Sequence, residues 1–400
     1  MQFVRKQLDK LKHNFEKGGK LEKYFYAYEA IDTFLFAPNT TTDSKGAHIR
    51  DAVDLKRLMM TVIIAMLPCL IFGIWNVGQQ HFLAIGQTAT LGEKFGVGLI
   101  QVLPVVVVSY GVGLGIEFIF SILRKHPVNE GFLVTGMLIP LVMPPDIPLW
   151  QVAIATAFAV IIGKEAFGGT GMNVLNVALT ARAFLYFAYP TDISGSVWTY
   201  IGEGAKTVEG YSGATPLSIA AESATNGTNV VSQLNSFGTG WNEGVFTFKS
   251  LFLGAMPGCI GETSTLMCLI GAAILIITGV GSWKIMFSVF AGAYGMGLLL
   301  NAVGGNAFMQ MPAHYHLVIG GLAFGAVFMA TDPVTASQTE TGKWIYGLLI
   351  GIFTVLVRVF NPAYPEGIML AILLMNVFAP LIDYFVVSAN KKRRLQRATV

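Results

Sequence analysis

Charged side chains are scarce in this sequence. Of its 400 residues 12% are Asp, Glu, Lys or Arg and 54% are hydrophobic, whereas a soluble domain has about 25% charged residues. Several apolar stretches approach or exceed the roughly 18 residues that cross a bilayer. The composition therefore excludes an ordinary soluble protein and predicts an all-α polytopic membrane protein. The net charge of +3 gives no sign of nucleic-acid binding, because the charges concentrate at the two ends.

Cysteine is equally scarce. Cys69, Cys259 and Cys268 form no CxxC pair, which excludes a disulfide framework. Three cysteines are also too few for an iron–sulfur cluster held by this chain alone, so any cluster lies in a partner or is shared with one. We interpret all three as buried structural thiols. Residues 1–57 lack a short apolar core with a small-residue cleavage site, and we expect no cleavable signal.

The apolar stretches divide the chain into about ten membrane spans. They are predicted at 58–77, 97–123, 132–145, 150–167, 174–189, 251–280, 285–303, 317–330, 344–360 and 367–388. The expected organisation has five parts: an amphipathic, interfacial N-terminal region (1–57), a first membrane half (58–189), a polar loop (190–250), a second membrane half (251–388) and a basic tail (389–400). Amphipathic lysine-rich segments in the N-terminal region predict contact with membrane lipid.

Charge asymmetry orients the spans. The N-terminal region and the tail are both basic, so the positive-inside rule places both ends in the cytoplasm. Most basic residues of the connecting turns then fall on the cytoplasmic side: Arg124, Lys125, Lys164, Lys284 and Lys343. The opposite turns carry Lys94, Lys206, Lys249 and Arg358. The same rule predicts that loop 190–250 lies outside the cytoplasm.

The third and eighth spans are short and interrupted. The third contains Pro140 and breaks at Pro144 and Pro145, and the eighth is rich in glycine and breaks before Pro333. If ten spans divide into two five-helix halves, these two spans occupy the same position in each half. Because each half has an odd number of spans, the second half begins on the opposite side of the membrane, so the halves are inverted. Matching broken helices in inverted halves indicate a transport or cofactor site near the middle of the membrane.

The polar loop contains a run of small residues, Glu209 to Pro216. Apart from Glu209, nothing in this run can act as an acid, a base or a metal ligand. It presents one threonine hydroxyl, Thr215, flanked by small residues, which suits a backbone that must enter the active site of another enzyme. A modification site is one interpretation, and ordinary turn chemistry is the other.

Polar residues inside apolar spans are further candidates. Asn173 and Asn176 follow a glycine-rich turn and lie three residues apart, which predicts one helical face; close packing of that turn is the alternative. Glu117 and Asp383 lie within spans, and acids there are costly and indicate function. Asp332 occupies the break of the eighth span, where it either caps the backbone or binds a cation.

Six sequence blocks carry a resemblance to a known family. They are HIRDAVDLKR (48–57), RKHPVNEGF (124–132), KEAFGGTGMNVLN (164–176), EGYSGATPLS (209–218), FMATDPVTAS (328–337) and NPAYPEGIMLAIL (361–373). With these blocks, spread over nearly the whole chain, it resembles the B subunits of sodium-translocating NADH:quinone oxidoreductases. The related D subunits of Rnf complexes share the same membrane core.

The resemblance implies that Thr215 carries FMN through a phosphoester bond made by a flavin transferase. Ser212, Gly213 and Ala214 complete the motif that the transferase recognises. The family usually has aspartate where this chain has Glu209. That change keeps the carboxylate one methylene further out, and we expect recognition to be kept.

The resemblance also implies the other sites. Asn173 and Asn176 match residues that contact a non-covalent riboflavin. The acids Glu117, Asp332 and Asp383 match residues tied to sodium uptake or translocation, with Asp332 and Glu117 as transient Na⁺ ligands. The resemblance also implies an apolar constriction between the broken helices. It is formed by four residues that the sequence alone would assign to the ordinary core: Val134, Met137, Phe324 and Phe328. Gly113, Glu117 and Glu29 border the implied quinone region.

The function implied is that of an inner-membrane subunit of a bacterial respiratory complex. Electrons would pass from FMN through riboflavin to ubiquinone, coupled to Na⁺ export. The partners implied are a subunit with the NADH site, FAD and an iron–sulfur cluster, and a second FMN-bearing subunit. One alternative is an Rnf-type redox subunit, although the long N-terminal region favours the quinone-reducing enzyme. The other is a redox-inactive channel or secondary transporter with the same core.

Overall fold

The computed structural model describes residues 2–16, 18–36, 55–128, 131–193, 198–202, 205–237, 246–361 and 366–398. Every regular element within these ranges is helical. Residues 37–54 of the predicted N-terminal region and 238–245 of the predicted polar loop lie outside the described residues. Within the described ranges, six helical segments are long and apolar enough to cross a membrane, which confirms a polytopic membrane protein.

The six long segments are α3 (Leu55–Ala84), α4 (Leu91–Arg124), α6 (Leu149–Ile161) with the short turn up to Phe167, α12 (Trp283–Val303), α15 (Glu340–Phe360) and α16 (Ile368–Ala398). Shorter apolar helices are α5 (Gly131–Leu141), α7 (Val177–Ala188) and α11 (Thr265–Ile277). The N-terminal region forms α1 (Gln2–Phe15) and α2 (Phe25–Leu35). The polar loop contains α8 (Pro216–Asn226) and α9 (Val230–Ser236), and α10 (Phe248–Leu253) follows.

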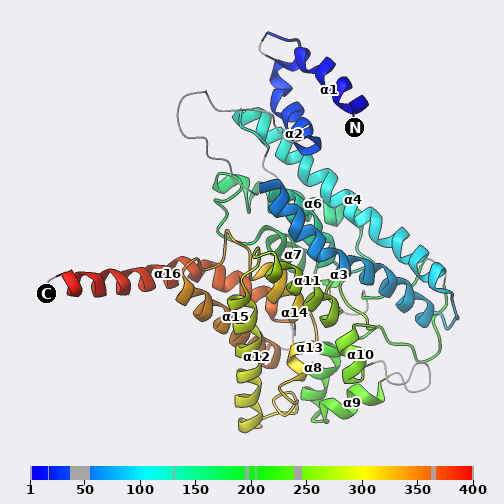
Figure 1. The fold of residues 1–400 in the computed structure, drawn as a ribbon. Helices are drawn as coiled ribbons and strands as arrows, with labels where there is room; N and C mark the ends of the chain where they lie inside the picture. Colours follow the sequence, from blue (N-terminus) through cyan, green and yellow to red (C-terminus); the bar gives the residue numbers. More distant parts are fainter. Residues whose placement is uncertain are drawn as a thin grey trace.

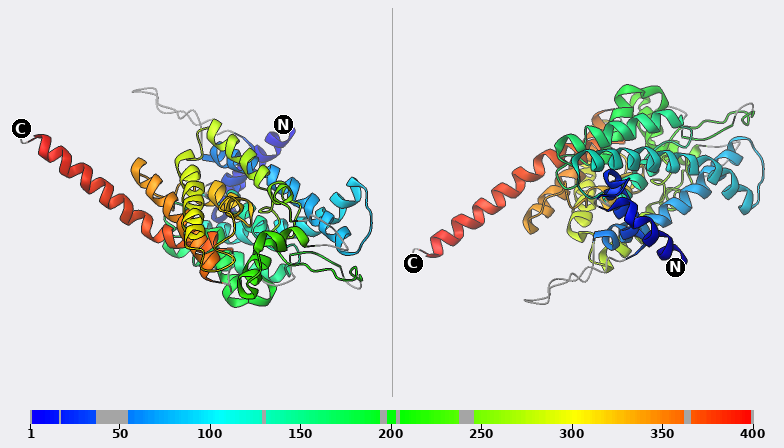
Figure 2. Two further views of the ribbon diagram at one scale, coloured as in Figure 1. Left: turned by 90° about the horizontal axis from the view of Figure 1, so that it is seen from below. Right: turned by 90° about the horizontal axis from the view of Figure 1, so that it is seen from above.

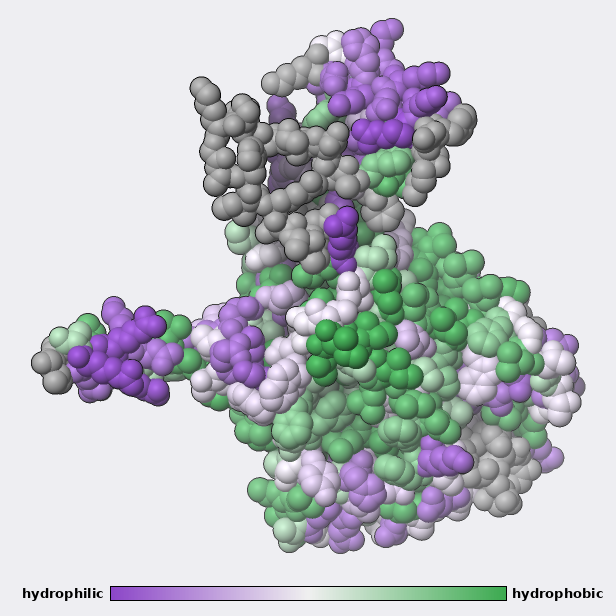
Figure 3. All heavy atoms as spheres, viewed as in Figure 1, coloured by the Kyte–Doolittle hydropathy of each residue, from purple (hydrophilic) through white to green (hydrophobic). Residues whose placement is uncertain are grey.

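Figure 1 places α1 and α2 at one end of the molecule and α8, α9 and α10 at the other. An apolar surface lies between these two ends (Figure 3). The exposed large apolar side chains include Ile100 on α4, Ile277 on α11 and Leu298 on α12. Such a surface is costly in water and fits the hydrocarbon core of a bilayer. The C-terminal part of α16 projects away from the bundle (Figures 1 and 2).

From their second helix on, the helices of the two membrane halves pair in the same order, whereas the packing of α3 against α4 has no comparable counterpart between α11 and α12. In the first half α4 packs against α6 and α6 against α7, while α5 contacts α3, α4 and α7. In the second half α12 packs against α15 and α15 against α16, while the π-helix η4 (Gly325–Met329) contacts α11, α12 and α16. The halves meet where α3 packs against α11 and α7 against α16.

The eighth predicted span is broken more extensively than the sequence indicates. It consists of α13 (Tyr315–Val318), α14 (Leu322–Phe324) and η4, with Gly320 in a left-handed conformation between α13 and α14. The guanidinium of Arg358 donates to the main-chain carbonyls of His316 and Ile319 at 2.6 and 2.9 Å. Arg358 is therefore a buried residue that satisfies the carbonyls freed at the break, and its assignment to an outer turn is wrong.

Lys164 is predicted to lie on a cytoplasmic turn, but its side chain is buried. The sixth predicted span is also interrupted, because residues 254–264 between α10 and α11 are not helical. Asn173 and Asn176 do not share a helical face. Gly168, Gly169 and Gly171 all have positive φ, so the chain stays out of a helix until Asn176 caps α7, its side chain accepting from Leu179 N at 3.2 Å.

Candidate functional site

Two cavities contain Thr215, the two predicted riboflavin residues and part of the predicted ion path. The first has a volume of about 400 Å³ and opens beside the polar loop. Its wall includes Thr215, Ser218, Arg182, Trp198 and Glu262. That volume lies within the roughly 300–1,000 Å³ of pockets that bind small ligands. We call it the Thr215 pocket.

Thr215 is held at the start of α8. Its backbone is extended, and its hydroxyl oxygen accepts a hydrogen bond from Ser218 N at 3.3 Å, which makes Thr215 the N-cap of the helix. Pro216 follows at the first helical position, where a missing N–H costs nothing. The hydroxyl thus lies at the positive end of a helix dipole and at the wall of a cavity. This position suits a group that carries a phosphate.

The residues before Thr215 leave the loop accessible. Glu209 and Ser212 are exposed, whereas Gly213 is buried. Gly210 has φ +78°, a left-handed conformation that favours glycine. Tyr211 is partly buried, and this burial raises the pKa of its phenol above the usual value. The exposed carboxylate of Glu209 and the hydroxyl of Ser212 are available to a modifying enzyme.

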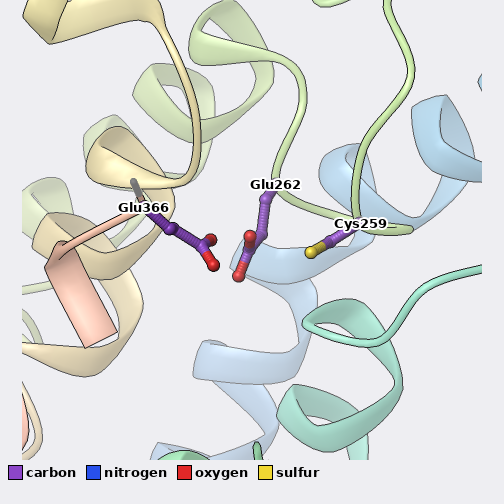
Figure 4. A group of neighbouring side chains, drawn as sticks. All are labelled: Cys259, Glu262 and Glu366. Carbon is purple, nitrogen blue, oxygen red and sulfur yellow. The ribbon is translucent and has the colours of Figure 1, made fainter. Parts of the chain in front are cut away.

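The deepest wall of the Thr215 pocket holds a buried cluster of ionisable side chains that sequence reasoning missed. Arg182 donates to Glu366 Oε2 at 2.7 Å and to Cys259 Sγ at 3.0 Å. The carboxylate of Glu262 points toward that of Glu366 (Figure 4). The sequence signal that could have found it is Arg182, a charged residue within an apolar span.

The second cavity, of about 180 Å³, lies between the two membrane halves. Its walls come from α3, α5, the glycine-rich turn, α11 and the end of η4: they include Val134, Lys164, Thr170, Asn173, Asn176, Phe328 and Asp332. The structure thus brings the predicted riboflavin residues and part of the predicted ion path to one place. We call it the Asn176 cavity.

Asn176 and Asp332 are in direct contact in this cavity. The Asn176 amide donates to Asp332 Oδ2 at 3.3 Å, across 156 positions of sequence. Asp332 also accepts from Val334 N and from the Thr335 hydroxyl, each at 3.1 Å. Asp332 therefore fixes the turn that follows it through its local bonds, while the bond from Asn176 ties it to the other half of the molecule. Asn173 lines the same cavity and donates to Leu175 O at 3.0 Å.

The four residues predicted to form a constriction pack in one apolar cluster. Met137 and Phe324 are buried, as is Phe328, and Val134 packs against them. The rings of Phe324 and Phe328 lie with their centroids 5.0 Å apart. Along the chain, Phe324 and Phe328 lie between Gly321, which lines the Thr215 pocket, and Asp332, which lines the Asn176 cavity together with Val134 and Phe328. A dry apolar constriction of this kind can stop ions by excluding water.

Glu117 is buried in α4 and forms an ion pair with Lys164. Nearby on the same helix, Gly113 is covered by the ring of Phe132, which occupies the space that a Cβ would need. Glu29 lies in α2, which packs against α4. The predicted quinone region therefore lies along α4, with Glu117 paired rather than free.

Asp383 is tied to the start of α15. Its carboxylate accepts hydrogen bonds from the Ser337 and Thr339 hydroxyls, both at 2.6 Å, and from Gln338 N and Thr339 N at 2.7 and 2.9 Å. These four bonds fix the turn that precedes α15. The structure does not bring Asp383 to either cavity among the described residues.

The fold and the two cavities define a polytopic helical membrane protein with ionisable groups buried between its halves. Comparison with known proteins is more specific. Residues 42–392 match the NQR2, RnfD, RnfE family, and the chain belongs to that family.

Two curated relatives are named as B subunits of the Na(+)-translocating NADH-quinone reductase. The protein of Ectopseudomonas mendocina is 50% identical to this chain, over 98% of the chain and 99% of the relative. That of Chromohalobacter salexigens is 48% identical, over 98% and 96%. The similarity therefore extends over nearly the full length of both proteins.

Proposed function

We propose that this chain is the flavin-bearing membrane subunit of a bacterial complex that oxidises NADH, reduces a quinone and exports Na⁺. Its family and its full-length similarity to relatives of that name support the complex and the activity. The observation that carries the role of this subunit is the hydrogen bond between Asn176 and Asp332. It joins a residue proposed to hold a flavin to one proposed to bind the transported ion.

FMN is proposed to be linked to Thr215 through its phosphate. The site fits this group, because a phosphoester at the N-cap of α8 meets the positive end of the helix and its unused N–H groups. Arg182 and Trp198, in cation–π contact, lie in the same pocket and offer a charge and an aromatic face to the flavin ring. Glu209, Ser212, Gly213 and Ala214 are the proposed recognition segment for the flavin transferase.

Riboflavin is proposed to bind at the Asn176 cavity. The polar groups there fit the edge of a flavin ring, since Asn173 and Asn176 present amides and the buried Thr170 hydroxyl has no hydrogen-bond partner among the described residues. The cavity is smaller than a usual ligand pocket of at least roughly 300 Å³, so it holds one end of the flavin. Bound flavins supply the ability to take electrons one at a time or in pairs.

Coupling is proposed to pass through Asn176. Its amide can donate a hydrogen bond either to the flavin or to Asp332. A change in the hydrogen bonds that the flavin accepts therefore alters those of the Asp332 carboxylate. Asp332 can then bind Na⁺, a hard cation that prefers oxygen ligands. Phe324, Phe328, Met137 and Val134 form the proposed barrier beyond it. Glu117 is a second proposed Na⁺ ligand, and Asp383 stays a predicted part of the ion path.

Ubiquinone is proposed to bind beside α4, near Gly113 and Glu117, with α2 and Glu29 completing the region. The contact between α2 and α4 supports this placement. The NADH site, FAD, an iron–sulfur cluster and a second FMN are assigned to partner subunits.

The proposed topology has about ten spans in two inverted five-helix halves, with broken helices third and eighth and both termini in the cytoplasm. The matching order of helix pairing in the two halves supports this arrangement. So does the separation of α1 and α2 from α8 and α9 at opposite ends of the molecule (Figure 1). The Thr215 pocket then faces outward and the Asn176 cavity faces the cytoplasm.

The test is covalent flavin on Thr215. The denatured complex, produced with the flavin transferase, should show a fluorescent band for this chain, and Thr215→Ala should abolish it. Thr215→Ser keeps a hydroxyl at the N-cap and serves as the matched control for folding. A non-fluorescent wild-type band would refute the flavin-bearing role and favour a redox-inactive channel with the same core.

A further inference from the structure

Three segments that are distant in sequence meet in the Thr215 pocket, at the break between α13 and α14. Glu262 comes from the turn before α11 and Glu366 from the turn before α16 (Figure 4). Gly321 comes from the break itself. A Cβ added at Gly321 would lie 2.7 Å from Glu262 Oε2 and 3.1 Å from Glu366 Oε1. Both carboxylates therefore converge on the backbone of Gly321.

The two carboxylates carry more negative charge than Arg182 balances. Arg182 forms an ion pair with Glu366 at 2.7 Å. Glu262 is only 4% exposed, and its Oε1 has no hydrogen-bond partner among the described residues. The Glu262 side chain is hydrogen-bonded to Glu366 and to Cys259, and the buried Oε1 that is left without a partner favours a cation as ligand. Arg358 is a second buried cation near Glu366, and its guanidinium is held by the main-chain carbonyls of residues 316, 319 and 366.

The donors available select the kind of cation. The Sγ of Cys259 and the carboxylate oxygens of Glu262 and Glu366 lie within 4.8 Å of one another. A thiolate in such a group favours a soft metal ion. Here, however, the Cys259 sulfur already accepts a hydrogen bond from Arg182. The carboxylates and the irregular backbone at Gly320 and Gly321 are left, and oxygen ligands suit a hard cation such as Na⁺.

The position of the pair relative to η4 gives it a place in the ion path. Gly321 precedes Phe324 and Phe328, and Asp332 follows them on the same broken span. The apolar constriction therefore has an acidic group at each end. The end at Glu262 opens into the Thr215 pocket.

We propose that Glu262 and Glu366 form a Na⁺ site at the outer end of the ion path, from which the ion leaves through the Thr215 pocket. Glu262 supplies the buried oxygen that has no hydrogen-bond partner among the described residues. Glu366 supplies the second carboxylate, and Arg182 holds Glu366 in place. This inference rests on the proposed function, because it assigns the release end of the same path.

The test uses the whole complex in proteoliposomes, with Na⁺ varied separately on the two sides. Na⁺ on the Thr215 side should inhibit turnover, because it binds at a release site and keeps that site occupied. Glu262→Gln should raise the Na⁺ concentration needed for half-inhibition by about tenfold or more, because a charged ligand is lost. The KM for Na⁺ on the opposite side should stay unchanged. Equilibrium binding of ²²Na⁺ to the purified complex should show the loss of one ion per complex.

Two further variants make the test specific. Gly321→Ala keeps both charges but places a methyl group between the carboxylates, so it should also weaken inhibition by Na⁺ on the Thr215 side. This variant keeps the proposal testable if the Glu262→Gln complex fails to assemble. Glu93→Gln removes an exposed carboxylate at the start of α4, outside the Thr215 pocket, and should behave as wild type. Wild-type inhibition and binding in Glu262→Gln or Gly321→Ala, or an equal effect of Glu93→Gln, would overturn the site. A wild-type complex without Na⁺-dependent turnover would instead refute the proposed function.

Discussion

Buried charged side chains in this protein form ion pairs with residues that are distant in the sequence. Glu117 pairs with Lys164, and Arg182 with Glu366, in places where each side chain is largely removed from solvent. If one member of such a pair is removed, the other is left as an unpaired charge in an apolar environment, which strongly destabilises the fold. The pairs therefore fix how α4 meets the turn after α6, and how α7 meets the turn before α16.

The Glu117–Lys164 pair gives a prediction about stability. Lys164→Met should lower the free energy of unfolding by about 3–5 kcal/mol, because Glu117 is left buried without its cation. Adding Glu117→Gln should recover a large part of this loss. Thermal unfolding of the purified protein in detergent measures both. A double variant less stable than the single one would show that the pair does not determine stability.

Asp332 gives a prediction about function at the scale of a residue. Asp332→Asn keeps the shape of the side chain and removes its charge, so Na⁺-dependent turnover should fall while bound flavin stays intact. Flavin fluorescence of the denatured protein and the Na⁺ dependence of quinone reduction are the two measurements. An unchanged Na⁺ dependence would argue against an ion-binding role. Thr335→Ala removes only one hydrogen bond to Asp332 and should have a smaller effect.

At the scale of single residues, the sequence indicates the unusual ones better than their partners. Thr215 stands out as the threonine of a small-residue run and Asp332 as an acid at a helix break, and the structure places them at two cavities. Charge counting assumes that a basic residue near the end of a span is solvated, whereas Lys164, on the turn after α6, and Arg358, within α15, are both buried. Their burial depends on Glu117 and on the carbonyls of α13, which local sequence does not reveal.

The helical elements follow from hydrophobicity, whereas their interruptions depend on distant contacts. Nine of the predicted spans overlap a helix or paired helices at nearly the predicted place, for example 97–123 with α4 and 344–360 with α15. The break at Gly320 lies inside an apolar stretch and is held by Arg358 from α15. The π-helix η4 is likewise set by packing. Neither feature has a periodicity that a single sequence can show.

Close packing of α4 against α5 gives a prediction at the scale of elements. A Cβ at Gly113 would lie 1.8 Å from Phe132 Cζ, and Phe132 is fully buried. Gly113→Ala should therefore destabilise the protein by about 1–3 kcal/mol. Phe132→Leu in the same chain should restore part of this, because it shortens the side chain that the new methyl group meets.

Gly111→Ala is the matched control for this packing. Gly111 lies on the same helix, is exposed, and has open space at its Cβ position. In a helix interior this change should stabilise by about 0.5–1 kcal/mol. Equal apparent melting temperatures for Gly111→Ala and Gly113→Ala would show that Phe132 does not restrict this contact.

At the scale of the whole molecule, the two membrane halves meet through few elements. The contact between α3 and α11 places the sulfur atoms of Cys69 and Cys268 3.8 Å apart. All three cysteines are buried, as their apolar surroundings in the sequence indicate. The sequence also indicates the division into halves, through the matching broken spans, but not which helices form their interface.

The thiol pair tests this interface. A membrane-permeant oxidant should join Cys69 to Cys268, and fragments of the two halves should remain linked after limited proteolysis until a reductant is added. Cys259 should stay reduced, because its sulfur faces Arg182 in another part of the structure. Mass spectrometry of the fragments identifies the link. A bond that includes Cys259 would contradict the described packing.

The N-cap position of Thr215 has a consequence for the order in which the protein matures. The hydroxyl oxygen that accepts from Ser218 N is the same oxygen that would become esterified. Attachment of a phosphate therefore replaces a weak helix cap by an anion at the same helix end, which strengthens the first turn of α8. If the proposed flavin is attached there, its attachment would act as a late folding step of the polar loop. Chains without it would then expose a less protected loop to proteases.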